Sequence, residues 1–127
     1  MDAETIEKES IRLVRLYKRR LRLNNWIVHV QMNNDPEWEN MATTTCIDGR
    51  DEAIVLVSSK QAWTLDLLRR TIAHELVHIV MNNLWVLSHE WADTLKSKKQ
   101  KLNNSQFERA IEEATNHISE VICSLRK

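Results

Sequence analysis

The chain has 127 residues, of which 43% are hydrophobic, and its 18 basic and 18 acidic residues leave no formal net charge. This length and composition suit one small core, so we expect a single domain spanning residues 1–127. A single glycine and a single proline exclude collagen-like and linker-rich classes, and no apolar run approaches a membrane span. The distant cysteines Cys46 and Cys123 form no disulfide framework or CxxC motif, and the acidic N-terminus does not resemble a signal peptide, so we expect a reducing, cytoplasmic location.

The first predicted element is a helix over residues 4–22, where apolar residues recur at helical spacing, with acidic first turns and a basic last turn. Residues 26–32 alternate between apolar and polar side chains, which predicts a half-buried strand. A loop leads to a Thr-rich strand over residues 41–47. The segment Asp48–Asp51 then predicts a turn, with Gly49 where a positive φ is needed.

The apolar run over residues 53–58 predicts a well-covered strand. A helix should begin after Thr64, which suits an N-cap, and run to about Met81. A polar connection follows, in which residues 88–99 suit a short helix of their own. A final helix over residues 106–124 carries one apolar stripe. The order of helix, three strands, helix, connection and helix predicts an α+β fold.

The strongest chemical signal lies in the helix that follows Thr64, where His74, Glu75 and His78 spell H-E-x-x-H. Side chains four residues apart on a helix share one face, about 5–6 Å apart, so two imidazoles can hold one zinc ion. Glu75 follows the first histidine and can take a proton from a water molecule that the metal activates. The surrounding residues are uncharged or apolar, and burying these three side chains among them is costly unless something satisfies them. The pattern therefore predicts a catalytic zinc site rather than a solvated surface patch.

Residues 71–80 resemble the extended zinc-binding signature of the zincin metallopeptidases. The order of elements over about residues 26–122 also resembles a minimal zincin core, as found in SprT-like and ImmA/IrrE-like domains and in compact gluzincin-type proteins of phages and prokaryotes. The resemblance implies a zincin-like core of N-terminal helix, small three-stranded sheet, H-E-x-x-H helix and C-terminal helix. It also implies a zinc metalloprotease that acts on proteins or peptides, with Glu75 as the general base.

In zincins, an extended substrate pairs with the edge of the sheet above the metal. The strand over residues 53–57 is the best candidate for that edge, although an internal strand explains its apolar run equally well.

A catalytic zinc site needs a third protein ligand, and the resemblance offers several arrangements. The metzincin arrangement is excluded, because Met81 and Leu84 stand where it has glycine and histidine. A SprT-like site would use His89, but Glu90 stands where that pattern usually has glycine.

A gluzincin-like site would take a glutamate from the final helix, which offers Glu112 and Glu113. In the small gluzincin-type proteins, the ligand is followed by small or polar residues that allow close helix packing and can support it. Those that follow Glu112 are Thr115, Asn116 and Ser119. Bulkier residues follow Glu113, so the resemblance favours Glu112 over both Glu113 and His89 as the third zinc ligand.

Three further residues have both an ordinary and a functional interpretation. Thr71 lies one turn before Glu75 and either orients its carboxylate or bonds to a backbone carbonyl. His117 could stabilise an oxyanion but suits a plain surface position better, and His29 suits the solvent face of its strand.

Two basic clusters, in residues 12–22 and 96–101, suit a helix end and a solvated linker, so with zero net charge we do not expect nucleic-acid binding. Two alternative functions remain at this point. One is a catalytically silent zincin-like binding or regulatory module, and the other is a SprT-like protease that acts on DNA-associated proteins. The sequence defines neither the physiological substrate nor the oligomeric state.

Overall fold

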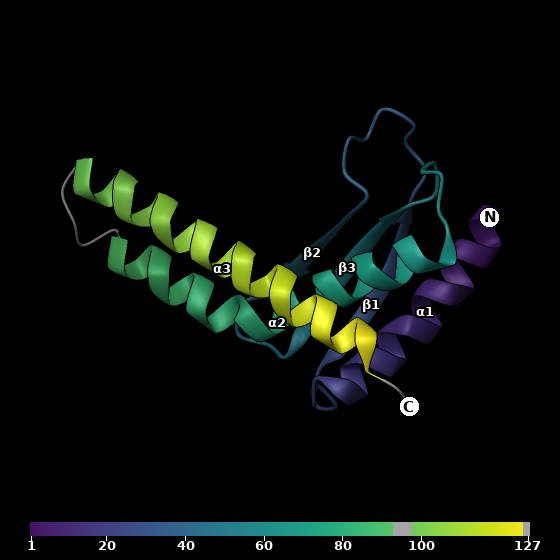
Figure 1. Ribbon diagram of the computed structural model, residues 1–127, viewed down its shortest axis with the longest axis horizontal. Coiled ribbons are helices and arrows are strands. Elements are labelled where there is room, and N and C mark those ends of the chain that lie inside the picture. Colours follow the sequence, from purple (N-terminus) through teal and green to yellow (C-terminus); the bar gives the residue numbers. More distant parts are fainter. Residues whose placement is uncertain (93–97, 126–127) are drawn as a thin grey trace.

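The computed structural model describes residues 1–92 and 98–125, without the side chains of residues 83, 88, 91, 92 and 98–104. Its elements are α1 (Ala3–Arg20), β1 (Ile27–Asn33), β2 (Ala42–Cys46), β3 (Glu52–Ser58), α2 (Leu65–Ala92) and α3 (Lys98–Ser124). This is the predicted α+β fold, with an N-terminal helix, a three-stranded mixed sheet, a central helix and a C-terminal helix packed against it (Figure 1). Within the described residues, no helix has the length and apolarity needed to cross a membrane.

Helix α1 begins and ends at local capping interactions. The Asp2 carboxylate accepts a hydrogen bond from the Thr5 amide at 2.8 Å, which satisfies one free amide of the first turn. At the other end Arg22 has a φ of 56°, and the Leu23 amide donates to the Lys18 carbonyl at 2.8 Å. This left-handed residue closes a Schellman-type turn, so the helix ends at Arg20, two residues before the predicted end at residue 22.

Strand β3 lies in the centre of the sheet, parallel to β1 and antiparallel to β2. Residues 53–57 suited an edge strand and an internal strand equally, and the structure shows the internal position, so the proposal that they form the substrate-binding edge is wrong. The edge strand that contacts α2 is β2. Gly49, in the turn between β2 and β3, has a φ of 73°, as the turn signal predicted.

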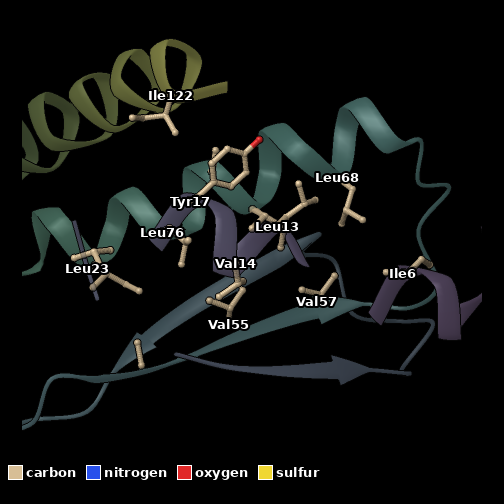
Figure 2. Packing of buried hydrophobic residues seen from close by; sticks show 14 of the residues in the cluster. Ile6, Leu13, Val14, Tyr17, Leu23, Val55, Val57, Leu68, Leu76 and Ile122 are labelled. Carbon is tan, nitrogen blue, oxygen red and sulfur yellow. The ribbon is translucent and has the colours of Figure 1, made fainter. Parts of the chain in front are cut away.

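Helices α1 and α2 cover one face of the sheet. Figure 2 shows Val55 and Val57 of β3 pointing toward Val14 of α1 and Leu76 of α2, and all four belong to one buried cluster. Fully burying an apolar side chain of this size contributes about 1.5–3 kcal/mol. This packing fixes α2 on the sheet and thereby sets the position of the side chains on its opposite face.

Helix α2 is longer than predicted. It continues past Met81 to Ala92, so residues 88–92 belong to it and do not start a separate helix. Residues 93–97 lie outside the described residues, and α3 begins at Lys98 rather than at residue 106. No glycine or proline follows Met81 to break the helix, and packing against α3 stabilises the extra turns. Figure 1 shows the two helices side by side, extending beyond the sheet.

Candidate metal centre

The H-E-x-x-H segment lies in the part of α2 that packs on the core. Four residues within and beside it have fully buried side chains: Ile72, Ala73, Leu76 and Val77. The imidazoles of His74 and His78 are half-buried, with 25% and 31% of their side-chain surface exposed. The apolar neighbours therefore anchor the helix, and the histidines face the solvent-accessible side.

His74, His78 and Glu112 bring their ligand atoms together. Nε2 of His74 lies 3.0 Å from Nε2 of His78 and 3.0 Å from Oε1 of Glu112. Nε2 of His78 lies 4.0 Å from Oε2 of Glu112. One ligand atom from each residue falls within a group whose members are all within 4.8 Å of one another. Ligands of a tetrahedral zinc ion are separated by about 3.3 Å, so this spacing suits one metal ion.

Small residues at the contact between α2 and α3 allow Glu112 to reach the histidines. Thr115 is fully buried and Ser119 is 6% exposed. The Thr115 hydroxyl donates to the Ile111 carbonyl at 2.7 Å, and the Ser119 hydroxyl donates to the Asn116 carbonyl at 2.9 Å. These hydroxyls are satisfied within their own helix, so Thr115 helps the helices to pack but does not hydrogen-bond to Glu112.

Glu75 is the buried carboxyl of the site, with an exposure of 6%. The Thr44 hydroxyl of β2 lies 2.8 Å from its Oε1 and 3.0 Å from its main-chain oxygen. Burial raises the pKa of Glu75 to about 7; the Thr44 hydrogen bond opposes this rise, and the negative charge of Glu112 adds to it. A carboxyl with this pKa can exchange a proton near neutral pH.

His78 favours the form that binds metals. Burial, and then the charge of His74, lower its pKa, while the Glu112 carboxylate acts in the opposite direction. A neutral imidazole has a free nitrogen lone pair, so the lowered pKa leaves this side chain ready to act as a ligand.

The other candidate ligands lie elsewhere. His89 is on α2 three turns beyond His78, about 16 Å along the helix axis, and its Nε2 lies 3.9 Å from Oε1 of Glu108. Glu113 is exposed and is not in the group with the two histidines. The structure therefore places Glu112, and neither His89 nor Glu113, beside His74 and His78.

The structure also shows where the remaining histidines and Thr71 lie. His117 is exposed on α3, and His29 pairs with Glu52 at 2.6 Å on the sheet. Thr71 lines the cavity next to His74, but the hydroxyl bonded to Glu75 belongs to Thr44. Around Thr44 the sequence indicated only a Thr-rich strand. No local sequence pattern predicts a hydrogen bond to a residue 31 positions away.

Two cavities meet at the site and form a cleft between β2 and the helices. The larger, of about 590 Å³, lies over the three potential ligands and extends to Met81, Trp85 and Ile111. The smaller, of about 310 Å³, is lined mainly by polar side chains: Arg70, Thr71, Asn116, Ser119 and Glu120. Both cavities share Ala42, His74 and Glu75. The cleft therefore extends to both sides of Glu75.

No family model, curated protein or solved structure matches this chain. The interpretation of the site therefore depends on its own geometry: a His-His-Glu group on two helices that could hold a metal ion, beside a buried carboxyl.

Proposed function

We propose that the chain is a zincin-like zinc metalloprotease of the gluzincin type, with His74, His78 and Glu112 as zinc ligands and Glu75 as the general base. The observation that carries this proposal is the convergence of the three ligand atoms within 4.8 Å beside a carboxyl that is 6% exposed. Two histidines and a glutamate are a ligand set of catalytic zinc sites, whereas structural sites usually have four protein ligands. Among the described residues, this group has three members.

The donor set suits zinc in chemistry as well as in number. The lowered pKa of His78 favours a neutral nitrogen ligand, and Glu112 supplies a carboxylate whose side chain is 52% exposed. The cavity over these residues leaves room for a water molecule and a peptide carbonyl group. A SprT-like site is not proposed, because His89 lies three turns away along α2.

When bound, zinc supplies Lewis acidity, which makes a water molecule more acidic and stabilises negative charge on a carbonyl oxygen. The Glu75 carboxylate accepts a proton from the attacking water and transfers it to the leaving amine. Both acts require one group to take and give a proton near neutral pH, and burial raises the pKa of Glu75 toward that range.

The substrate we propose is an extended segment of a protein or peptide. Strand β2 is an edge strand, and its consecutive residues Ala42–Cys46 line the larger cavity. The main chain of such a strand can pair with an extended peptide that crosses the cleft. We propose no nucleic-acid partner, in keeping with the zero net charge.

The first experiment measures zinc per chain in protein purified without an affinity tag. Wild type is expected to hold about one zinc, and His74→Ala and Glu112→Ala are expected to lose it. The matched control is His89→Ala, which removes a histidine from the same helix and should keep the metal. A wild-type chain without zinc after reconstitution would reject the metal site and the enzyme with it.

A second experiment tests catalysis. The zinc-loaded chain should cleave casein or a mixture of quenched fluorescent peptides, and a chelator should stop the reaction. Glu75→Gln should keep zinc and lose hydrolysis. If the chain holds one zinc ion and cleaves nothing, it is a catalytically silent binding or regulatory module instead.

A further inference from the structure

We infer that Thr44 is a positioning residue for Glu75, whose carboxyl it holds in the orientation needed for proton transfer. This inference rests on the proposed function of the site. Strand β2 would then do more than pair its main chain with the substrate. The Thr44 hydroxyl belongs to this edge strand and not to the helix that carries the H-E-x-x-H motif.

The register of the sheet selects Thr44 from three consecutive threonines. Thr44 is paired with Val55, whose side chain is fully buried on the face that the helices cover. Neighbouring side chains of a strand point to opposite faces, so Thr43 and Thr45 are directed to the other side of the sheet. The middle threonine is therefore the one that reaches α2.

The Thr44 hydroxyl contacts Glu75 at two points. Its Oγ1 lies 2.8 Å from Oε1 of the carboxyl and 3.0 Å from the main-chain oxygen of the same residue. A hydroxyl that lies beside both the carboxyl and the main-chain oxygen of one residue limits the rotation of the side-chain bonds between them. A glutamate has several rotatable bonds, and both cavities adjoin Glu75, so without Thr44 its carboxyl could rotate toward either one.

This contact also gives the two oxygens of the Glu75 carboxyl different roles. A hydroxyl group has one proton, which the main-chain oxygen and Oε1 of Glu75 both attract, and the shorter contact is the one to Oε1. Donation to Oε1 leaves Oε2 as the oxygen that can accept a proton from water. Catalytic groups must be held close to the productive geometry, and displacement by about 1 Å can cost roughly 100-fold in rate.

The first arm of the test uses metal-free protein and does not depend on hydrolysis. A double-mutant cycle combines Thr44→Val with Glu75→Ala and measures the folding equilibrium constant by urea unfolding in the presence of a chelator. We expect a coupling of about tenfold, because the two side chains share a partly buried hydrogen bond. The control cycle combines Thr45→Val with Glu75→Ala and should be additive, since Thr45 is exposed.

The second arm uses zinc-loaded protein and a quenched fluorescent peptide that the wild type cleaves. Thr44→Val should lower kcat by about 10- to 100-fold, with KM and zinc content unchanged, because valine keeps the shape of threonine but lacks the hydroxyl. Thr44→Ser, which keeps the hydroxyl, should restore most of the rate. If Thr44 had only a structural role, Thr44→Val and Thr44→Ser would not differ in kcat while KM and zinc content stayed the same.

The outcomes separate this inference from the proposed function. Additive mutations in the first cycle, or a kcat that Thr44→Val leaves unchanged, would overturn the positioning role alone. A zinc-loaded wild type that cleaves no peptide overturns the proposed function and the positioning role with it. Coupling, loss of kcat in the valine variant and rescue by serine together support the inference.

Discussion

The two glutamates of the site lie in opposite surroundings. Glu75 is 6% exposed and has a pKa raised to about 7, whereas the side chain of Glu112 is 52% exposed and lies beside two imidazoles. The difference comes from the helices that carry them, because α2 packs on the sheet while α3 packs mainly along α2. Burial suits a group that must exchange a proton near neutral pH. Exposure suits a ligand that a metal ion must reach.

The largest expected effect comes from the same substitution made in each glutamate. Glu75→Gln should lower the rate of peptide hydrolysis by about 10²–10⁴-fold and keep one zinc per chain, because the variant loses the base but no ligand. Glu112→Gln should instead lower the affinity for zinc, since a neutral amide is a weaker ligand than a carboxylate. Zinc analysis and initial rates on one fluorescent peptide measure both effects.

Glu113→Gln is the control for this pair, because it changes an exposed glutamate next to Glu112 on α3. It should alter neither zinc content nor rate. If Glu75→Gln lost zinc, or if Glu113→Gln lost more zinc than Glu112→Gln, the division of roles between the buried and the exposed carboxyl would be wrong.

The second prediction concerns stability in the presence of metal. Zinc at about 1,000 times its dissociation constant should stabilise the wild type by roughly 4 kcal/mol, because the ion binds the folded state and joins α2 to α3 through Glu112. Thermal unfolding with and without zinc measures this gain. The gain should disappear in His74→Ala. An equal rise in Tm for the wild type and His74→Ala would place the zinc at another site.

The third prediction is a pH dependence caused by the buried glutamate. The folded state raises the pKa of Glu75 from 4.5 to about 7, so it keeps a proton that the unfolded chain releases. This carboxyl therefore imposes no penalty below pH 4.5, an increasing penalty as the pH rises to 7, and its full penalty above that, on the order of 3 kcal/mol. In metal-free protein, Glu75→Gln should match the wild type near pH 4.5 and exceed its stability by that amount at pH 8.

Urea unfolding at both pH values, with a chelator present, measures the difference between the two proteins. The titration of His78 contributes equally to the unfolding free energy of both proteins, because both carry that residue, so it cancels in the difference. Adding zinc should reduce the advantage of the variant, since a nearby cation favours the ionised carboxyl. A constant difference at all pH values would show that burial does not raise the pKa of Glu75.

The residues of the site also differ in how far the sequence predicts them. Spacing and apolar neighbours located His74, Glu75 and His78 on one helix, because a helix fixes which residues share a face. The resemblance to gluzincin-type proteins favoured Glu112, and the small buried residues Thr115 and Ser119 show how α3 comes close enough. These features depend on local periodicity and on packing between two helices.

The features that the sequence did not predict depend on contacts between distant segments. The order of strands places residues 53–57 inside the sheet, and an apolar run alone cannot distinguish that position from an edge. Thr44 reaches Glu75 only because β2 pairs antiparallel with β3. Helix α2 continues to Ala92 because packing against α3 stabilises turns that extend beyond the sheet.

The smallest expected effect is that of His89→Ala on the metal-free protein. His89 is 40% exposed in its side chain and lies 3.9 Å from a Glu108 carboxyl that is 48% exposed, and such a surface pair contributes about 0–1 kcal/mol. Its ring also packs against Trp85, with ring centroids 4.6 Å apart. Urea unfolding should therefore show a loss of less than about 1 kcal/mol, far below the effect of the buried Glu75. A loss of several kcal/mol together with a loss of zinc would mean that α2 bends after Met81 and brings His89 back to the metal, in which case Glu112 would not be the third ligand.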